Sequence, residues 1–235
     1  AHPAMCFGDP TGSVRVVAHG GTAGYTYTLN GTSNNTGIFN NLPGGSYLIS
    51  VTDAAGCFTS ISTNITQPSA PLAALAFTTD VTCRGGANGE IRIIPSGGIP
   101  GYRFNLNGTT NTTGRFENLP AGNYTVYLED ANGCPTSVPV TLNEPPTNLS
   151  ATVSVTNVQC FGEAHGQISV SASGGTAVYL YTLGNTSNTT GTFSDLPAGN
   201  YTILVRDGGG CEVFVSAEIT QPATELRVSA VPVHR

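Results

Sequence analysis

The sequence predicts an all-β protein, and two observations carry that prediction. Of its 235 residues, 30 are Gly and 15 are Pro, and Thr, Ser and Asn are abundant, whereas good helix formers are scarce. Short apolar stretches also alternate with polar residues in a period of two. In residues 124–128, for example, Tyr124, Val126 and Leu128 would share one face of a strand. We therefore expect short strands joined by tight turns.

A unit of 77 residues occurs three times without an insertion, so that residue n of one unit matches residue n + 77 of the next. The cysteines recur with this period, as Cys6, Cys83 and Cys160 and again as Cys57, Cys134 and Cys211. A period of this length is too long for one coil of a solenoid and suits a small sandwich domain. It predicts repeat 1 (residues 1–68), repeat 2 (69–145) and repeat 3 (146–222), followed by a C-terminal strand (223–235).

Within repeat 2 the pattern predicts six strands in chain order. They cover residues 72–78, 90–94, 102–106, a short segment at 115–116, 124–129 and 138–142. Gly-Gly pairs, Asn-Gly and Asp-Ala-Asn-Gly supply the turns between them. Six or seven strands in each repeat predict tandem immunoglobulin-like β-sandwich domains.

One turn motif supports this fold. Residues 119–124, Leu-Pro-Ala-Gly-Asn-Tyr, have the spacing of a tyrosine corner, in which the Tyr hydroxyl bonds to backbone a few residues upstream. The motif recurs at residues 42–47 and 196–201. An ordinary tight turn before a strand is the alternative interpretation.

At these residues the repeats resemble the SprB repeat family. The matching segments of repeat 2 are CRGGANGEI from Cys83, SGG from Ser96, GY at Gly101, LPAGNYTV from Leu119 and EDANGC from Glu129. The family is found in very large surface adhesins of Bacteroidota and in gliding motility. The resemblance implies a secreted, extracellular or cell-surface protein that serves in adhesion or spacing, and it supplies no catalytic residues.

The two ends of the chain differ from the other repeat junctions. Repeats 2 and 3 each begin with an apolar strand that leads to the first Cys, at residues 72–83 and 149–160, whereas residues 1–5 precede Cys6. Residues 226–235 align with that same starting strand. We expect this tail to complete repeat 1 of another subunit by β-augmentation. The candidate core-facing residues are Leu226, Val228 and Ala230, with Val231 and Val233 taking their place if the register slips by one.

This arrangement predicts a structural subunit of an extracellular filament. Donor and acceptor lie at opposite ends of the chain, so the contact is heterologous and need not close, and the partner is a homopolymer of the same chain. Pro232 argues slightly against a donor strand, although an edge strand tolerates Pro. The alternative is a segment of a long surface adhesin whose repeats act as spacers or bind carbohydrate or another surface.

Six cysteines in a Gly-rich chain of extracellular type predict disulfides. The simplest and favoured pairing lies within each repeat, as Cys6–Cys57, Cys83–Cys134 and Cys160–Cys211. In a standard sandwich, however, these two positions lie near opposite ends. Pairing across adjacent repeats, Cys6–Cys134 and Cys83–Cys211, therefore stays open, and it leaves Cys57 and Cys160 to bond between neighbouring subunits.

Asn-X-Ser/Thr sequons predict attached glycans on surface loops. The candidates are Asn34, Asn111 and Asn188, which recur with the 77-residue period, together with Asn30 and Asn107. Composition alone can produce such sequons, since Asn and Thr are common throughout this chain. The same loops could instead contact a ligand or another surface.

Charge and hydropathy exclude several classes of protein. The chain has eight basic residues, all of them Arg, against 14 acidic ones, and its net charge of -6 argues against nucleic acid as a partner. No apolar run reaches the roughly 18 residues of a membrane span. The first residues, AHPAMC, lack the features of a signal peptide, so we expect any such peptide to have been removed.

No residue pattern predicts an enzyme, a metal or a cofactor. Asp53, Asp130 and Asp207 recur, but a single acid in each repeat favours a turn-forming Asp over a calcium ligand. The four His residues share no repeat position, and neither a catalytic triad nor a pair of carboxylates stands out.

Overall fold

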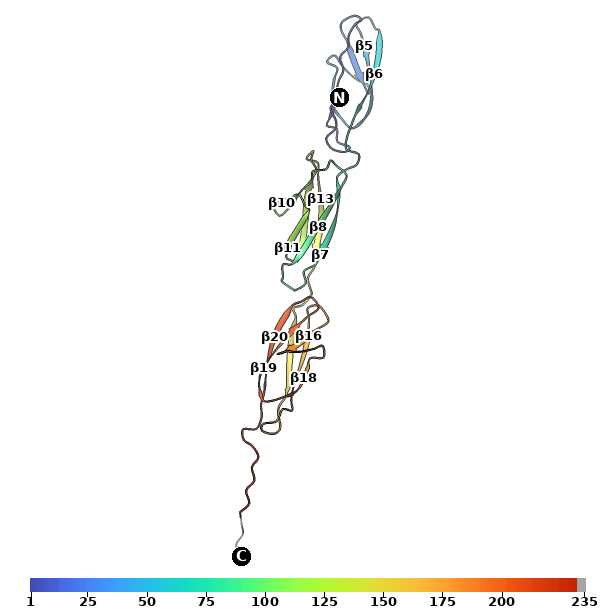
Figure 1. Ribbon diagram of the computed structural model, residues 1–235. Coiled ribbons are helices and arrows are strands. Elements are labelled where there is room, and N and C mark those ends of the chain that lie inside the picture. Colours follow the sequence, from blue (N-terminus) through green and yellow to red (C-terminus); the bar gives the residue numbers. More distant parts are fainter. Residues whose placement is uncertain (232–235) are drawn as a thin grey trace. The chain divides into compact units, whose positions relative to one another are not determined.

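The computed structural model describes residues 1–231, and these residues form 20 β-strands and no helix (Figure 1). The all-β prediction is therefore confirmed. The candidate Val233 and the other residues of 232–235 lie outside the described part of the chain.

In the described range, no helix is long and apolar enough to cross a lipid bilayer.

Repeat 1 contains six strands in two antiparallel sheets. One sheet has two strands in the order β1-β4, and the other has four in the order β3-β2-β5-β6, in which Figure 1 shows β5 and β6 side by side. The strands are β1 (Gly12–Arg15), β2 (Thr26–Leu29), β3 (Thr32–Asn34), β4 (Ile38–Leu42), β5 (Gly45–Thr52) and β6 (Phe58–Ile65).

Repeat 2 contains seven strands. Three form a sheet in the order β11-β8-β7, and four form a sheet in the order β10-β9-β12-β13. The strands are β7 (Ala73–Thr79), β8 (Gly89–Ser96), β9 (Arg103–Leu106), β10 (Thr109–Asn111), β11 (Arg115–Leu119), β12 (Gly122–Glu129) and β13 (Pro135–Leu142). All six strands expected in this repeat are present, and β10 is an additional one. On β12, Val126 and Leu128 are buried and Tyr124 is half-buried, as the period of two predicts.

Repeat 3 has the same strand order as repeat 2, with sheets β14-β15-β18 and β17-β16-β19-β20. Its strands are β14 (Ser150–Thr156), β15 (Gly166–Ser173), β16 (Leu180–Leu183), β17 (Thr186–Asn188), β18 (Thr192–Leu196), β19 (Gly199–Arg206) and β20 (Glu212–Ile219). Seven strands in a three-stranded and a four-stranded antiparallel sheet form an immunoglobulin-like β-sandwich.

The chain divides into two compact units, and the division runs through repeat 2. Unit 1 comprises residues 1–78, 91–117 and 123–141, and unit 2 comprises residues 79–90, 118–122 and 142–235, of which 142–231 are described. Each unit therefore contains one outer repeat together with part of repeat 2.

Both outer repeats have a core made of side chains from their two sheets. In repeat 3, Ile168 of β15 and Ile203 of β19 are fully buried in one cluster that also contains Phe193. In repeat 1, Val14 of β1 and Ile49 of β5 belong to the corresponding cluster. Burying such side chains contributes about 1.5–3 kcal/mol each, which is the main term that holds the sheets of a repeat together.

Two tyrosine hydroxyls confirm the predicted tyrosine corner. Tyr47 donates a hydrogen bond of 2.7 Å to the carbonyl oxygen of Pro43, and Tyr201 donates one of 2.7 Å to that of Pro197. A second set of tyrosine hydrogen bonds, which the sequence did not predict, closes the loops that precede β2, β9 and β16. Its members are Tyr25 to Gly20 O, Tyr102 to Gly97 O and Tyr179 to Gly174 O.

Val178 has a backbone conformation that β-branched residues avoid. Its φ is +80°, its side chain is 77% exposed, and the equivalent positions in the other repeats are Gly24 and Gly101, with φ of +111° and +121°. The strain is therefore not compensated by burial of the side chain.

We expect Val178→Gly to raise the free energy of unfolding by about 1 kcal/mol, because it removes the left-handed strain of a β-branched residue. The reverse change in repeat 2, Gly101→Val, is the matched control and should destabilise the chain. Urea unfolding followed by circular dichroism measures both. A destabilising effect of Val178→Gly would contradict the assignment of strain to this residue.

Candidate functional site

The edge of β1 in repeat 1 is the feature that sets this repeat apart. In repeats 2 and 3 the equivalent strands, β8 and β15, have a neighbour on each side, whereas β1 pairs as a strand with β4 alone. The free side of β1 therefore presents backbone N–H and C=O groups without a strand partner in residues 1–231. Such groups are the template for adding another strand.

A single backbone bridge marks where the absent strand would end. His2 N donates to Ser13 O at 2.7 Å and Ser13 N donates to His2 O at 3.2 Å, forming an isolated antiparallel bridge. By the 77-residue period this pair matches Thr156 and Gln167, the last of seven residue pairs between β14 and β15. In the described part of the chain, repeat 1 therefore has the last pair of this ladder and lacks the other six.

The free edge also exposes part of the core. Val170 of β15 and Ile93 of β8 are 3% and 2% exposed. Val16 occupies the same position in repeat 1, and it is only half-buried. Since the three residues have similar size and polarity, the difference reflects the strand that is absent beside Val16.

A glycine pair forms the floor of the vacant position. In repeat 2, a Cβ on Gly97 would collide with the carbonyl oxygen of Pro71, and in repeat 3 a Cβ on Gly174 would collide with that of Asn148. Within residues 1–231, nothing lies within 4 Å of the place that a Cβ on the equivalent Gly20 would take. The Gly-Gly pattern predicts only a turn, whereas in repeats 2 and 3 the pair also admits a neighbouring backbone.

The second glycine of the pair shows the same difference. Gly98 N donates to Ala70 O and Gly175 N donates to Thr147 O, each at 3.0 Å. The Cβ atoms of Leu72 and Leu149 lie 3.3 Å from the place that a Cβ on Gly98 or Gly175, respectively, would take. Among residues 1–231, Gly21 N has no such carbonyl partner, and the closest contacts of its Cβ position are all with Asp53.

The C-terminal tail carries apolar residues that no other described residue covers. Residues 223–231 belong to no strand, and Leu226, Val228 and Val231 are 97%, 98% and 81% exposed. Ala230 is exposed as well. The residues at the equivalent positions in repeat 3, Leu149, Ala151 and Val153, pack against the core of that repeat.

The disulfides lie between repeats, so the favoured pairing within each repeat is wrong. Cys6 bonds to Cys134 and Cys83 bonds to Cys211, with Cα–Cα distances of 5.7 and 5.6 Å. Each bond lies inside one compact unit. Cys57 and Cys160 are free and exposed.

Strand length explains why the two cysteines of one repeat cannot meet. In repeat 3, Cys211 directly precedes β20, whereas Val158 N bonds to Thr220 O just beyond the other end of this strand. Cys160 follows Val158 by two residues. Eight residues of extended strand span about 26 Å, far beyond the reach of a disulfide.

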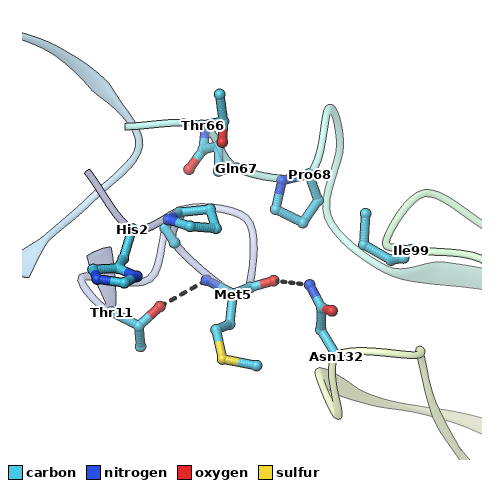
Figure 2. Close-up of a pocket in the computed structure, with 10 residues that line it drawn as sticks. His2, Met5, Thr11, Thr66, Gln67, Pro68, Ile99 and Asn132 are labelled. Atoms are coloured by element: carbon cyan, nitrogen blue, oxygen red, sulfur yellow. Dashed lines mark hydrogen bonds between the residues drawn. The ribbon is translucent and has the colours of Figure 1, made fainter. Parts of the chain in front are cut away.

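The contact around Cys6–Cys134 is supported by polar bonds. Figure 2 shows the backbone of Met5 held on both sides, since its N–H donates to Thr11 Oγ1 at 2.8 Å and its carbonyl accepts from Asn132 Nδ2 at 2.8 Å. A hollow of about 530 Å³ adjoins this contact, lined in part by Pro68 and Ile99. At the second disulfide, Thr82 O lies 3.4 Å from the sulfur of Cys211, matching the 3.5 Å between Met5 O and the sulfur of Cys134.

The recurrent Asp shapes the loop that holds the second Cys of each repeat. Asp130 accepts backbone N–H groups from Ile99, Asn132 and Cys134, each at 2.9 Å. Asp53 accepts the equivalent bonds from Thr22, Ala55 and Cys57, and Asp207 accepts them from Thr176, Gly209 and Cys211. The turn-forming role predicted for these residues is therefore confirmed.

These bonds change the acidity of two of the carboxyl groups. The N–H groups of Thr22 and Cys57 lower the pKa of Asp53. Burial raises the pKa of Asp130, but the backbone N–H groups of Ile99, Cys134 and their neighbours outweigh it, so the net shift is downward. Both groups are therefore stabilised as carboxylates.

Among residues 1–231, no three His, Cys, Asp or Glu side chains gather into a group that could hold a metal ion.

The recurrent glycosylation candidates have a structural role. Asn34 Oδ1 accepts the backbone N–H groups of Thr36 and Gly37, while its Nδ2 donates to Ile38 O at 3.0 Å. Asn111 and Asn188 make the same bonds in the other repeats. Turn formation thus accounts for the period of these three residues.

The other two candidates, Asn30 and Asn107, lie at hairpin tips with φ of +48° and +50°. Both are exposed, and each precedes the Gly of an Asn-Gly turn. Glycans at any of the five positions stay a prediction.

Comparison with known protein families gives one match that recurs in all three repeats. The profile of the SprB repeat matches residues 1–34, 75–111 and 152–188. No curated protein matches the chain in sequence.

Several solved structures align with the chain at low identity. The N-terminal eight Ig domains of Down syndrome cell adhesion molecule align with a TM-score of 0.39 and 13% identity over 94% of this chain and 36% of that one. Domains 1–6 of surface layer protein SbsC give 0.33 and 14% over 86% and 35%. The fibronectin(III)-like modules of CbhA from Clostridium thermocellum give 0.29 and 14% over 67% and 100%. The chain thus spans about a third of the chains in the first two structures.

We expect Asp130→Asn to lower the free energy of unfolding at pH 7 by about 2 kcal/mol, because both carboxylate oxygens accept backbone N–H groups, whereas Asn offers one neutral acceptor oxygen and an NH2 group that cannot accept. The pKa of Asp130 is lower in the folded state, so its contribution is complete above the unfolded pKa of about 4 and is lost as the pH falls below it. The difference between the two proteins should therefore shrink in acid.

Urea unfolding between pH 7 and pH 2.5 measures this difference. The exposed Asp9→Asn is the matched control and should unfold like the wild-type chain. A constant difference between Asp130→Asn and wild type across this pH range would contradict the role of the carboxylate.

Proposed function

We propose that this chain, which carries three tandem SprB repeats, is a structural subunit of an extracellular filament on or near a cell surface. Tandem SprB repeats with immunoglobulin-like sandwiches fit a cell-surface adhesin. Two disulfides fit an oxidising compartment such as the cell exterior. In the proposal, residues 226–231 of one copy form the first strand of repeat 1 of the next copy. The role is structural and involves no catalysis.

The single observation that carries the proposal is the vacancy along β1. Repeats 2 and 3 fill this position with β7 and β14, which belong to the chain itself. Among residues 1–231, nothing lies beside Gly20, whereas the segments that lead into β7 and β14 bring Pro71 O and Asn148 O against the equivalent Gly97 and Gly174. Residues 226–231 of a second copy align by the 77-residue period with the start of β14 and have a similar apolar pattern. They also belong to no strand of their own chain, so they are available to fill the vacancy.

The 77-residue period specifies the register of the donated strand. Because β14 pairs Ala151 with Ala172 and Val153 with Val170, Val228 of the donor would pair with Ala18 of the acceptor, and Ala230 with Val16. Leu226 would cover Gly21, as Leu149 covers Gly175. This register selects Leu226, Val228 and Ala230 as the inward set and turns Val231 outward.

Two energy terms favour such a joint. Leu226 and Val228 are almost fully exposed in one chain, and burying each contributes about 1.5–3 kcal/mol. The strand also adds ladder hydrogen bonds worth about 0.5–1.5 kcal/mol each. Because donor and acceptor lie on different repeats, each copy can accept one strand and donate another, so the contact propagates into a filament.

A second candidate function has an observation of its own. The side chains of Phe58, Phe77, Tyr127 and Phe214 are 81%, 54%, 59% and 65% exposed, and exposed rings are the surfaces on which sugar rings stack. The repeats would then serve as binding modules of an adhesin. Binding of the wild-type chain to a glycan array, lost on Phe58→Ala or Tyr127→Ala, would support this function over assembly alone.

The filament is tested by substitutions on the two faces of the donor strand. We expect Val228→Asp to raise the concentration needed for assembly by about 100-fold, because the register buries this side chain. Ser229→Asp is the matched control. Its equivalents, Leu75 and Thr152, are exposed, so this variant should assemble like the wild type.

Sedimentation over a concentration series and electron microscopy measure the effect. A chain that lacks residues 223–235 should remain monomeric and should bind a synthetic peptide of that sequence. Equal assembly by wild type and Val228→Asp, or wild-type monomers at every concentration, would contradict the proposal.

A further inference from the structure

We infer that Cys160 of one copy and Cys57 of the next form an intermolecular disulfide that locks each joint of the assembly. The inference rests on the proposed head-to-tail arrangement. Both thiols are free and exposed. Cys160 is the first Cys of repeat 3, and Cys57 is the second Cys of repeat 1. The disulfides Cys6–Cys134 and Cys83–Cys211 use the other four cysteines.

The two disulfides present define a rule for the third. Each joins the first Cys of one repeat to the second Cys of the repeat that follows, with a sequence separation of 128 residues. In the proposed filament, repeat 1 of the next copy follows repeat 3, because the tail after repeat 3 supplies its first strand. Cys160 and Cys57 would then stand in the same relation as Cys6 to Cys134.

The loop that carries Cys160 already has the form of the loops whose cysteines are paired. Gly162 N donates to Gln221 Oε1 at 2.9 Å, and Glu163 N bonds to Cys160 O. The equivalent bonds beside the disulfide-bonded cysteines run from Gly8 N to Gln67 Oε1 at 2.9 Å and from Gly85 N to Glu144 Oε2 at 2.6 Å. The backbone needs no rearrangement to present the Cys160 sulfur.

The loop that carries Cys57 is also formed in advance. Asp53 Oδ1 accepts the N–H of Cys57 at 2.9 Å, and Asp53 N donates to Cys57 O at 2.9 Å. Asp130 makes the same two bonds with Cys134, at 2.9 and 3.2 Å. Ala55 stands at the position of Asn132 and Gly209, and like Gly209 it has no side-chain donor for the bond that Asn132 makes to Met5 O.

The reaction needs an oxidant, and a small-molecule disulfide supplies it. The Cys160 thiolate attacks one sulfur of the reagent, forms a mixed disulfide and releases one thiolate. The Cys57 thiolate then attacks the protein sulfur of the mixed disulfide, forms the Cys57–Cys160 bond and releases the second thiolate. Two protein thiols lose two protons and two electrons, and the reagent is reduced to two thiols.

Two single variants test which cysteines meet. Cys57→Ser and Cys160→Ser are each mixed with oxidised glutathione, alone and then together in equal amounts, and separated on a gel without reductant. Under denaturing conditions, each variant alone should run as a monomer, the mixture should yield a covalent dimer, and the wild type should yield a ladder of covalent oligomers. Mass spectrometry should identify the peptide pair that joins Cys160 to Cys57. Dimers from either variant alone, in amounts equal to those from the mixture, would overturn the inference.

Two further chains separate this inference from the filament itself. The Cys57→Ser/Cys160→Ser double variant should still assemble, since the strand and not the disulfide drives assembly. The chain lacking residues 223–235 keeps both thiols but should cross-link roughly 100-fold more slowly, because it loses the effective concentration of a formed joint. Wild-type filaments that never cross-link would contradict the disulfide but not the filament. Cross-linking of the truncated chain as fast as that of the wild type would show that the bond lies outside the proposed joint.

Discussion

Each repeat depends on the β-ladder beside the equivalent strands β1, β8 and β15, a ladder that β7 completes in repeat 2 and β14 completes in repeat 3. In repeat 3 this ladder has seven residue pairs, and it brings Ala151 and Val153 onto the core. In repeat 1 it is reduced to the bridge between His2 and Ser13. The open edge of β1 and the half-buried state of Val16 follow from this one difference. A sandwich with an open edge is an acceptor for any strand of the right pattern.

The two disulfides have the same relation to the repeats. Each disulfide joins the loop that carries the first Cys of one repeat to the loop that precedes the last strand of the next repeat. The recurrent Asp shapes this second loop, as Asp130 does by accepting the N–H of Cys134. The disulfides therefore add a covalent bond at the two junctions between repeats, where the chain passes into β7 and into β14. A chain built in this way resists separation of its repeats through covalent and main-chain bonds at the same places.

Much of the fold was predictable, because a strict period and alternating burial are properties of the sequence itself. Tyr124, Val126 and Leu128 show this on β12. Strand β10 was missed because three residues are too few to show a period. The disulfide pairing could not be chosen from spacing, since it depends on which end of a strand each loop occupies. The role of Gly20 was hidden because the atom that requires a glycine at Gly97 and Gly174 is a backbone oxygen of a distant residue.

The central claim is that residues 226–231 of one copy become the first strand of repeat 1 of another. Electron cryo-microscopy of assembled protein, at a resolution that separates side chains, tests it most directly. The claim predicts an antiparallel strand along the free edge of β1, with Val228 opposite Ala18, Ala230 opposite Val16 and Leu226 over Gly21. A filament in which this edge is empty, or is filled by another segment, would contradict it.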